Sequence, residues 1–276
     1  MTKVSVGIAA NIIVPAPFLP RFSQPAKNMN PVVLITGGSR GIGAATALLA
    51  AQRGYAVAVN YTANSLAADE VVRQIRAGGG TAMAVQADVG VEADILRLFN
   101  QVDAKLGRLS ALINNAGVVD VAARVDEMTA ARLQRMFTVN IVGSFLCARE
   151  AVKRMSTKHG GAGGVIVNVS SAAARIGGGG QYVDYAASKG AIDTFTLGLA
   201  KEVALEGIRV NAVRPGIIET DIHASGGQPD RARQMAPMVP MQRAGSAHEV
   251  AKAIIWLMTE ESSYTTGSFV DVTGGR

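Results

Sequence analysis

Residues 32–43 read Val-Val-Leu-Ile-Thr-Gly-Gly-Ser-Arg-Gly-Ile-Gly. The apolar run from Val32 to Thr36 predicts a short strand buried on both faces, and a helix-like segment follows from Gly41 to Arg53. A strand, a glycine turn and a helix in this order are the context of a dinucleotide site. The glycines let a pyrophosphate approach the backbone, and the helix N-terminus presents free N–H groups. No Gly-Lys-Ser/Thr follows, which excludes a Walker-type phosphate loop.

The chain after this turn alternates between strand and helix patterns. Predicted strands cover residues 55–60, 81–87, 110–114, 165–170, 208–213 and 268–272. Predicted helices cover residues 65–77, 93–106, 130–156, 184–205 and 247–258, and residues 216–243 are irregular. This strict alternation predicts an α/β fold with one doubly wound, Rossmann-type parallel sheet of about seven strands and helices on both faces.

Composition and charge narrow the function classes. Of the 276 residues, 49% are apolar and 17% are charged, which excludes a disordered chain. The net charge is +6, but three of the excess charges (Lys3, Arg21 and Lys27) lie in the first 28 residues. No basic stripe with interleaved aromatics follows, so no nucleic-acid partner is predicted. Cys147, the only cysteine, lies in an apolar stretch that indicates a buried side chain, and the three histidines have no metal-ligand spacing, so no metal site is predicted.

Residues 1–28 form a separate segment. Its apolar stretch is too short and too broken by proline to span a membrane, and it contains no clean signal-peptide cleavage site. We therefore expect a poorly ordered extension at residues 1–28 and a single domain at residues 29–276. We also expect a cytoplasmic protein that does not associate with membranes.

Further motifs lie at the ends of the predicted strands and on two of the predicted helices. In chain order they are Thr36-Gly37-x3-Gly41-x-Gly43, Asp88, Asn114-Asn115-Ala116-Gly117, Asn140, Ser170-Ser171, Tyr185-x3-Lys189, Pro215-Gly216 and Thr220. In this order they resemble the short-chain dehydrogenase/reductase family, over nearly the whole range from Met29 to Arg276. The resemblance implies an enzyme that interconverts a carbonyl and a secondary alcohol by hydride transfer with a nicotinamide cofactor.

The resemblance assigns catalysis to Asn140, Ser171, Tyr185 and Lys189. Tyr185 and Lys189 are four residues apart and so share one face of a predicted helix. A free tyrosine has a pKa of about 10, and we expect the Lys189 ammonium to lower the pKa of Tyr185 toward the working range of a general acid or base. By resemblance, Tyr185 exchanges the proton, Ser171 binds the substrate oxygen, Lys189 holds the nicotinamide ribose, and Asn140 holds a water that links Lys189 to solvent.

The choice of serine depends on the loop that follows the fifth predicted strand. Ser171 lies one residue further from Tyr185 than is usual in the family. The intervening segment ends in four glycines, Gly177 to Gly180, which can absorb an insertion. Ser171 is therefore the predicted residue and Ser170 the alternative.

The cofactor is predicted to be NADP(H) rather than NAD(H). An NAD site usually carries an acid after the second strand, whereas here no acidic residue precedes Asp69. Arg40, inside the glycine turn, can pair with a 2′-phosphate in a charge-assisted contact. The predicted cofactor-binding residues are Gly37, Ser39, Arg40, Gly41, Ile42, Gly43, Asn60, Tyr61, Asp88, Val89, Asn115, Ala116, Gly117, Tyr185, Lys189, Pro215, Gly216, Ile218 and Thr220.

The resemblance suggests more than one class of substrate. Within the family the chain looks most like 3-oxoacyl-[acyl-carrier-protein] reductases and glucose-type sugar dehydrogenases, and a non-catalytic NADP-binding sensor is a further alternative. Residues 217–243 are Met-rich, which suits an apolar lid over a small carbonyl or alcohol but also suits packing or an oligomer contact. Lys153, Arg154 and Lys158 indicate either a solvated helix end or a contact with an acidic carrier protein. The resemblance also implies a homotetramer.

Overall fold

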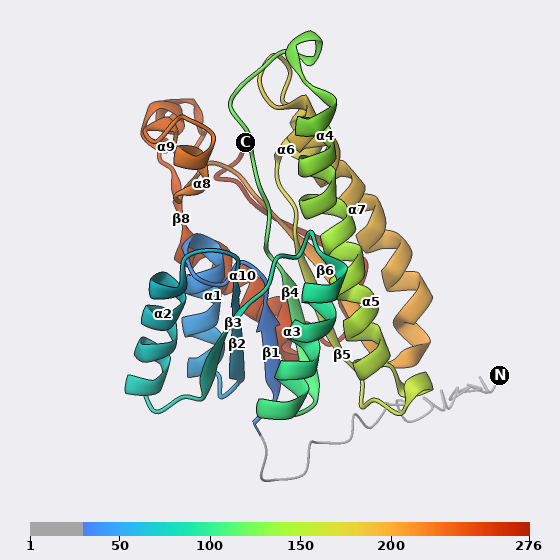
Figure 1. Cartoon of the computed structure of the whole chain (residues 1–276). Helices are drawn as coiled ribbons and strands as arrows, with labels where there is room; N and C mark the ends of the chain where they lie inside the picture. Colours follow the sequence, from blue (N-terminus) through green and yellow to red (C-terminus); the bar gives the residue numbers. More distant parts are fainter. Residues whose placement is uncertain (1–29) are drawn as a thin grey trace, which may run out of the picture.

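The computed structural model describes residues 30–276, apart from the side chain of His223. These residues build a seven-stranded parallel sheet with the strand order β3-β2-β1-β4-β5-β6-β9, which confirms the predicted fold class (Figure 1). Its strands are β1 (Val32–Ile35), β2 (Ala56–Tyr61), β3 (Ala82–Gln86), β4 (Leu109–Asn114), β5 (Gly164–Val169), β6 (Ile208–Pro215) and β9 (Phe269–Val272). The predicted extension at residues 1–28 lies outside the described residues.

The central strand β1 shows why the strands read as continuous apolar runs. All four of its side chains are buried. Val32 and Leu34 belong to the core on one face of the sheet, whereas Val33 and Ile35 belong to the core on the other face. Because both faces are covered by helices, no position of the strand is left for a polar residue.

Two layers of helices cover the sheet. Helices α3 (Glu92–Lys105), α5 (Gly143–Met155) and α7 (Val183–Val203) pack on one face, and α1 (Gly41–Gln52), α2 (Ser65–Ala77) and α10 (Ala247–Met258) pack on the other (Figure 1). Cys147 belongs to the first core, where burial raises the pKa of its thiol to about 12. It is therefore packed as a small apolar side chain, as predicted.

The predicted helix over residues 130–156 is interrupted. The chain forms α4 (Ala130–Phe137), then one π turn (Thr138–Val142), and then α5. The backbone at Gly143 lies close to the loop that follows β3. A β carbon at this position would lie 2.6 Å from the Val89 carbonyl oxygen, so the close approach requires glycine. Helical periodicity cannot reveal the interruption, since both halves keep the same apolar spacing.

The segment that looked irregular contains short elements. These are β7 (Ile218–Glu219), α8 (Ile222–Ser225), α9 (Arg231–Met235) and a 3₁₀ turn (Ala236–Met238), and β8 (Gly245–Ser246) follows just after the segment. Strands β7 and β8 pair in parallel beside the main sheet. The remaining short helix, α6 (Ala173–Ile176), follows β5. Within residues 30–276, no helix is both long and apolar enough to cross a membrane.

The order of the strands leaves a cleft between two neighbouring loops. From β1 the chain builds outward through β2 and β3, then returns to the other side of β1 with β4. The loops after β1 and β4 therefore leave the sheet in opposite directions. In doubly wound sheets, ligands bind at this point, beyond the carboxyl ends of the strands.

Candidate active site

A cavity of about 850 Å³ lies at the carboxyl ends of the central strands. Its lining joins the glycine turn, the loop after β4, the end of β5, the start of α7 and the segment after β6. The predicted site residues that line it are Gly37, Ser39, Arg40, Gly41, Ile42, Tyr61, Asp88, Val89, Asn115, Ala116, Gly117, Ser171, Tyr185, Lys189, Pro215, Gly216, Ile218 and Thr220. Gly43, Asn60 and Asn140 were predicted at the site but do not line the cavity.

The backbone of the glycine turn requires glycine at three positions. Gly37 and Gly41 have φ angles of +61° and +53°, in the left-handed region where a β carbon causes strain. Gly43 is needed for a different reason, because a β carbon there would lie 2.3 Å from the Gly37 carbonyl oxygen. Gly43 therefore lets α1 begin directly beneath the turn, and acts through packing rather than by facing the cavity.

The N-terminus of α1 faces this cavity with free backbone donors. Among the described residues, no side chain caps the first turn of α1 and no acidic side chain lies within it. Gly41 and Ile42 of that turn line the cavity. The uncapped N–H groups and the positive end of the helix dipole suit a bound pyrophosphate.

The glycine turn is tied to the loop after β4 by reciprocal hydrogen bonds. The Thr36 hydroxyl accepts from the backbone N–H groups of Asn115 and Ala116, both at 3.0 Å. The Asn115 side chain donates to the carbonyl oxygens of Thr36 and Gly37, both at 2.9 Å. Thr36 and Asn115 thereby hold the two sides of the cleft at a fixed separation.

Asn60 supports the turn from below. Its side chain is buried, accepts from the Gly37 N–H at 3.1 Å and donates to the Ala87 carbonyl oxygen at 2.9 Å. It thus links the end of β2 to the glycine turn and to the segment after β3. The predicted cofactor contact of Asn60 stays a prediction, and the contacts that it makes in the structure brace the turn.

The two serines at the end of β5 face different ways. The buried Ser170 hydroxyl donates to the Asp193 carboxylate at 2.6 Å and lies 3.2 Å from the Lys189 carbonyl oxygen, so it is directed at α7. Ser171 instead forms a side-chain hydrogen bond with Tyr185. The geometry therefore favours Ser171 over Ser170 as the hydroxyl beside the tyrosine.

Burial controls the acidity of Tyr185 and Lys189. Burial raises the pKa of Tyr185, and the hydrogen bond with Ser171 opposes this with a smaller effect. Burial lowers the pKa of Lys189 to about 8, while the Asp193 carboxylate acts in the opposite direction. The expected net lowering of the Tyr185 pKa by Lys189 is wrong for this arrangement. The Lys189 Nζ donates to the Val169 carbonyl oxygen at 2.7 Å and lies 5.6 Å from the centre of the Tyr185 ring.

Asn140 lies behind the cavity wall, in the π turn. Its buried side chain accepts from the Val118 N–H at 2.8 Å and donates to the Ser188 hydroxyl at 3.0 Å. A β carbon on Gly117 would lie 3.5 Å from Asn140 Oδ1 and 3.6 Å from Lys189 Nζ. Gly117 therefore lies beside both the Asn140 amide and the Lys189 ammonium.

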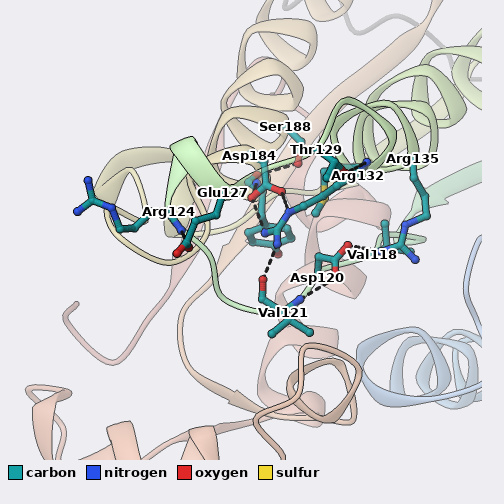
Figure 2. Close-up of polar contacts among 12 residues, drawn as sticks. Val118, Asp120, Val121, Arg124, Glu127, Thr129, Arg132, Arg135, Asp184 and Ser188 are labelled. Carbon is teal, nitrogen blue, oxygen red and sulfur yellow. Dashed lines mark hydrogen bonds and ion pairs between the residues drawn. The ribbon is translucent and has the colours of Figure 1, made fainter.

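A buried ion pair beside Tyr185 was not predicted. The Arg132 guanidinium contacts the Asp184 carboxylate with Nε at 2.8 Å and Nη2 at 3.3 Å, and their side chains are 11% and 0% exposed. Figure 2 shows Arg132 between Asp184 and the carbonyl of Val121, to which it donates at 2.6 Å. Asp184 also accepts from the Tyr185 N–H at 2.9 Å. The pair therefore fastens α4, the loop after β4 and the start of α7 to one another.

Two of the three basic residues near the end of α5, Lys153 and Arg154, form ion pairs within the chain. Arg154 pairs with Glu150 at 2.9 Å and with Asp103 at 2.7 Å, and Lys153 pairs with Glu150 at 2.9 Å. These contacts favour the hypothesis that the basic residues form a solvated helix end over the hypothesis that they bind an acidic carrier protein.

Comparisons with known proteins agree with this geometry. Residues 37–276 match the family model described as enoyl-(acyl carrier protein) reductase. The chain is 56% identical to an uncharacterized oxidoreductase of Escherichia coli, over 89% of this chain and 99% of the relative. The chain belongs to the short-chain dehydrogenase/reductase family. It is therefore an oxidoreductase that acts on CH–OH and C=O groups.

Other family members are similar over almost the same range. A 3-oxoacyl-[acyl-carrier-protein] reductase of Synechocystis is 39% identical, over 88% of this chain and 96% of the relative. Glucose 1-dehydrogenase 2 of Bacillus subtilis is 36% identical, over 88% and 93%. A solved mutant of a Serratia marcescens short-chain dehydrogenase/reductase has a TM-score of 0.82 at 32% identity and covers 90% of this chain and 98% of its own.

Breaking the buried ion pair will destabilise the fold. Arg132→Leu leaves the Asp184 carboxylate buried without its counter-charge, and we expect the free energy of unfolding to fall by about 3 kcal/mol. The control is Arg124→Leu, since the Arg124–Asp126 pair is 72% and 66% exposed and should contribute less than about 1 kcal/mol. Urea unfolding of both variants measures the difference, and equal losses would show that burial of the pair is not what matters.

Proposed function

We propose that this chain is an NADP(H)-dependent oxidoreductase that interconverts a carbonyl and a secondary alcohol, with Tyr185 as the general acid and base. One observation carries the proposal. The hydrogen-bonded hydroxyls of Ser171 and Tyr185 line the same cavity as Lys189 and the free N-terminus of α1. Acid-base groups and a phosphate-binding helix end are thus available to one ligand.

The residues of the cavity fit a nicotinamide dinucleotide. The glycine turn and the first turn of α1 would hold the pyrophosphate, Asp88 and Val89 would lie beside the adenine, and Lys189 would hold the nicotinamide ribose. Asn115, Ala116, Gly117, Pro215, Gly216, Ile218 and Thr220 would complete the walls. When bound, the cofactor supplies or accepts the hydride.

The proton chemistry belongs to the chain's own side chains. In carbonyl reduction, Tyr185 donates its phenolic proton to the substrate oxygen, and Ser171 stabilises the charge that develops on that oxygen. The Lys189 ammonium stabilises the phenolate that remains. Asn140 would hold a water that links Lys189 to solvent. In alcohol oxidation, Tyr185 accepts the proton instead.

Selection of NADP(H) rests on the charges around the second strand. Arg40 is exposed and lines the cavity. The residues that line the cavity at the end of β2 and just after it include Tyr61, Thr62 and Asn64, which are all neutral. A 2′-phosphate would meet a guanidinium there and no carboxylate from this strand end.

The names of two relatives suggest two classes of substrate, a 3-oxoacyl thioester and a glucose-type sugar. Both are carbonyl or alcohol substrates, and neither class alters the role of Tyr185. A non-catalytic sensor would bind the same cofactor and would need neither Ser171 nor Tyr185.

We also propose a homotetramer of catalytic domains, each formed by residues 29–276. Phe145 on α5 is 45% exposed and stacks on Phe195 of α7 with ring centres 3.7 Å apart, and Leu197 of α7 is 42% exposed. Apolar side chains on two adjacent helices suit contact with a second copy. A cytoplasmic location, and the absence of nucleic-acid, membrane and metal partners, stay predictions.

Removing the Tyr185 hydroxyl will abolish most of the turnover. Tyr185→Phe should lower kcat for NADPH-dependent carbonyl reduction by about 10²–10⁴-fold, because the general acid is lost. The control is Tyr264→Phe, which removes a hydroxyl from a fully exposed side chain outside the cavity and should leave kcat unchanged. The rate of both variants is measured from the fall in NADPH absorbance with ketones, sugars and β-ketoacyl thioesters as substrates. Undiminished turnover by Tyr185→Phe would refute the proposed acid-base role.

Removing the Arg40 guanidinium will change the cofactor preference. Arg40→Gln should reduce kcat/KM for NADPH by about 10–100-fold and leave that for NADH nearly unchanged, since a charged hydrogen-bonded contact is worth about 1.5–3 kcal/mol. Arg53→Gln, beyond the other end of α1 and paired with Glu261, is the matched control. A wild-type kcat/KM for NADH at or above that for NADPH would sink the prediction.

The rate of carbonyl reduction will depend on the protonation of Lys189. Because its pKa is lowered to about 8, Lys189 is an ammonium below that pH and a neutral amine above it, whereas the raised pKa of Tyr185 keeps the phenol protonated in the same range. We expect kcat/KM for reduction to be constant below about pH 8 and to fall above it. In Lys189→Arg, whose charge persists, the fall should disappear from this range even if the rate is lower. A wild-type profile that stays flat across this pH would contradict the role given to the ammonium.

A further inference from the structure

The cavity carries an excess of positive charge, and two of its cations have no function in the proposed chemistry. Its charged lining residues are Arg40, Asp88, Arg135, Lys189, Asp221, Arg231 and Arg276. Arg40 and Lys189 are assigned to the cofactor and the proton chemistry, and Arg135 forms an ion pair with Asp120 (Figure 2). Arg231 and Arg276 remain. Arg231 lies on α9, within residues 217–243, which we predicted to form a lid over the substrate.

Arg231 is oriented by neutral groups only. Its Nη1 donates to Gln228 Oε1 at 2.6 Å and its Nη2 donates to Gln181 Oε1 at 2.9 Å. The guanidinium carbon lies over the Tyr182 ring, 5.1 Å from its centre. Among the described residues, no carboxylate lies within ion-pair distance of Arg231. Its full charge is therefore held in place without being neutralised.

The neighbouring arginines show that this arrangement is particular to Arg231. Arg233, two residues along α9, pairs with Asp230 at 3.1 Å and is 81% exposed. Arg276 lines the cavity but is exposed, and in the described part of the chain no side-chain hydrogen bond orients its guanidinium. Only Arg231 combines a fixed orientation, an unpaired charge and a place in the cavity wall among the described arginines that line it.

A fixed guanidinium of this kind suits a carboxylate. It has five N–H donors in a planar fork, of which the two glutamine contacts use one at each terminal nitrogen. The planar fork matches the two oxygens of a carboxylate, and the walls of a cavity strengthen the attraction relative to bulk water. Gln181 and Tyr182 also lie just before Tyr185 in the chain, so the charge is held by the segment that leads into the proposed acid-base residue.

We propose that the substrate carries a carboxylate that binds Arg231, so that the enzyme reduces keto acids or oxidises the corresponding hydroxy acids. This inference rests on the proposed function, because it names the substrate class of the same site. Arg231 is then a specificity-determining residue, and a substrate without the negative charge loses that contact. The alternative role for the same contacts is a latch that joins α9 to the loop before α7, and the two roles predict different kinetics.

The test compares α- and γ-keto acids with their methyl esters, with NADPH as the reductant. For the wild-type protein we expect kcat/KM to be at least about tenfold higher for one or both acids than for the matching ester. Arg231→Gln keeps an amide able to contact Gln181 and Gln228, and should lower kcat/KM for the acid by about 10–100-fold and for the ester by less than about threefold. Arg231→Lys should restore part of the preference. Arg233→Gln, on the same short helix, should change neither.

Calorimetric binding of the same acids and esters to the NADP⁺-loaded protein gives a readout that does not depend on turnover. Tighter binding of the acid, lost in Arg231→Gln, supports the inference. Equal binding and equal kcat/KM of acid and ester would overturn it, and so would an equal loss for both in Arg231→Gln, which is the result expected of a latch. If the acid binds through Arg231 but nothing is reduced, the proposed oxidoreductase activity on keto acids fails, while the carboxylate site stands.

Discussion

The hydrogen bonds between Thr36 and Asn115 are the constraint on which the rest of the site depends. Beyond the ends of β1 and β4 the two strands part, so their next N–H and C=O groups lose their partners in the sheet. Each such group would cost about 1–3 kcal/mol if it were buried without a partner. Thr36 accepts two of these donors and Asn115 donates to two of these acceptors, so the cleft can stay open at no such cost. The free end of α1 and the space above it exist because this separation is fixed.

The start of α7 imposes a second constraint, because it carries charged side chains that are buried or nearly buried. Asp184, Lys189 and Asp193 all lie within its first three turns, and each has partners from another part of the chain. Arg132 neutralises Asp184, Arg214 pairs with Asp193 at 2.9 Å, and the Val169 carbonyl accepts from Lys189. Of these three residues, Lys189 alone has no ion pair within the described part of the chain, and burial lowers its pKa to about 8. The helix thus fixes its acids with counter-charges and leaves its lysine close to its titration point, where a change in local charge has the greatest effect.

The features that the sequence predicts well are those that depend on local patterns. The alternation of apolar runs and helical spacings predicts the sheet and six of its covering segments, and the four-residue spacing of Tyr185 and Lys189 places both on one face. The features that it misses depend on distant contacts. Arg132 and Asp184 are 52 positions apart with no shared motif, and the bracing position of Asn60 follows from where the loop after β3 passes. The shift in the pKa of Tyr185 also depends on distant contacts. The spacing of Tyr185 and Lys189 suggests that the ammonium lowers this pKa, but only the packed structure reveals the larger, opposite effect of burial.

The two sides of the cavity differ in how they are held, and this difference bears on specificity. The cofactor side is fixed by buried backbone and side-chain hydrogen bonds at the ends of parallel strands, where a substitution would disturb the sheet itself. The side that we propose to face the substrate contains α8 and α9, each of five residues or fewer, and is held by a few contacts such as those of Arg231 with two glutamine side chains. Such a segment can change its residues without changing β5, which Ser171 follows, or α7, which carries Tyr185. Relatives of similar identity can therefore carry the names of a 3-oxoacyl-carrier reductase and of a glucose dehydrogenase while sharing one fold. It follows that the substrate of this chain has to be inferred from the charges on its own α9 segment, because similarity elsewhere in the sheet reports on the shared chemistry alone.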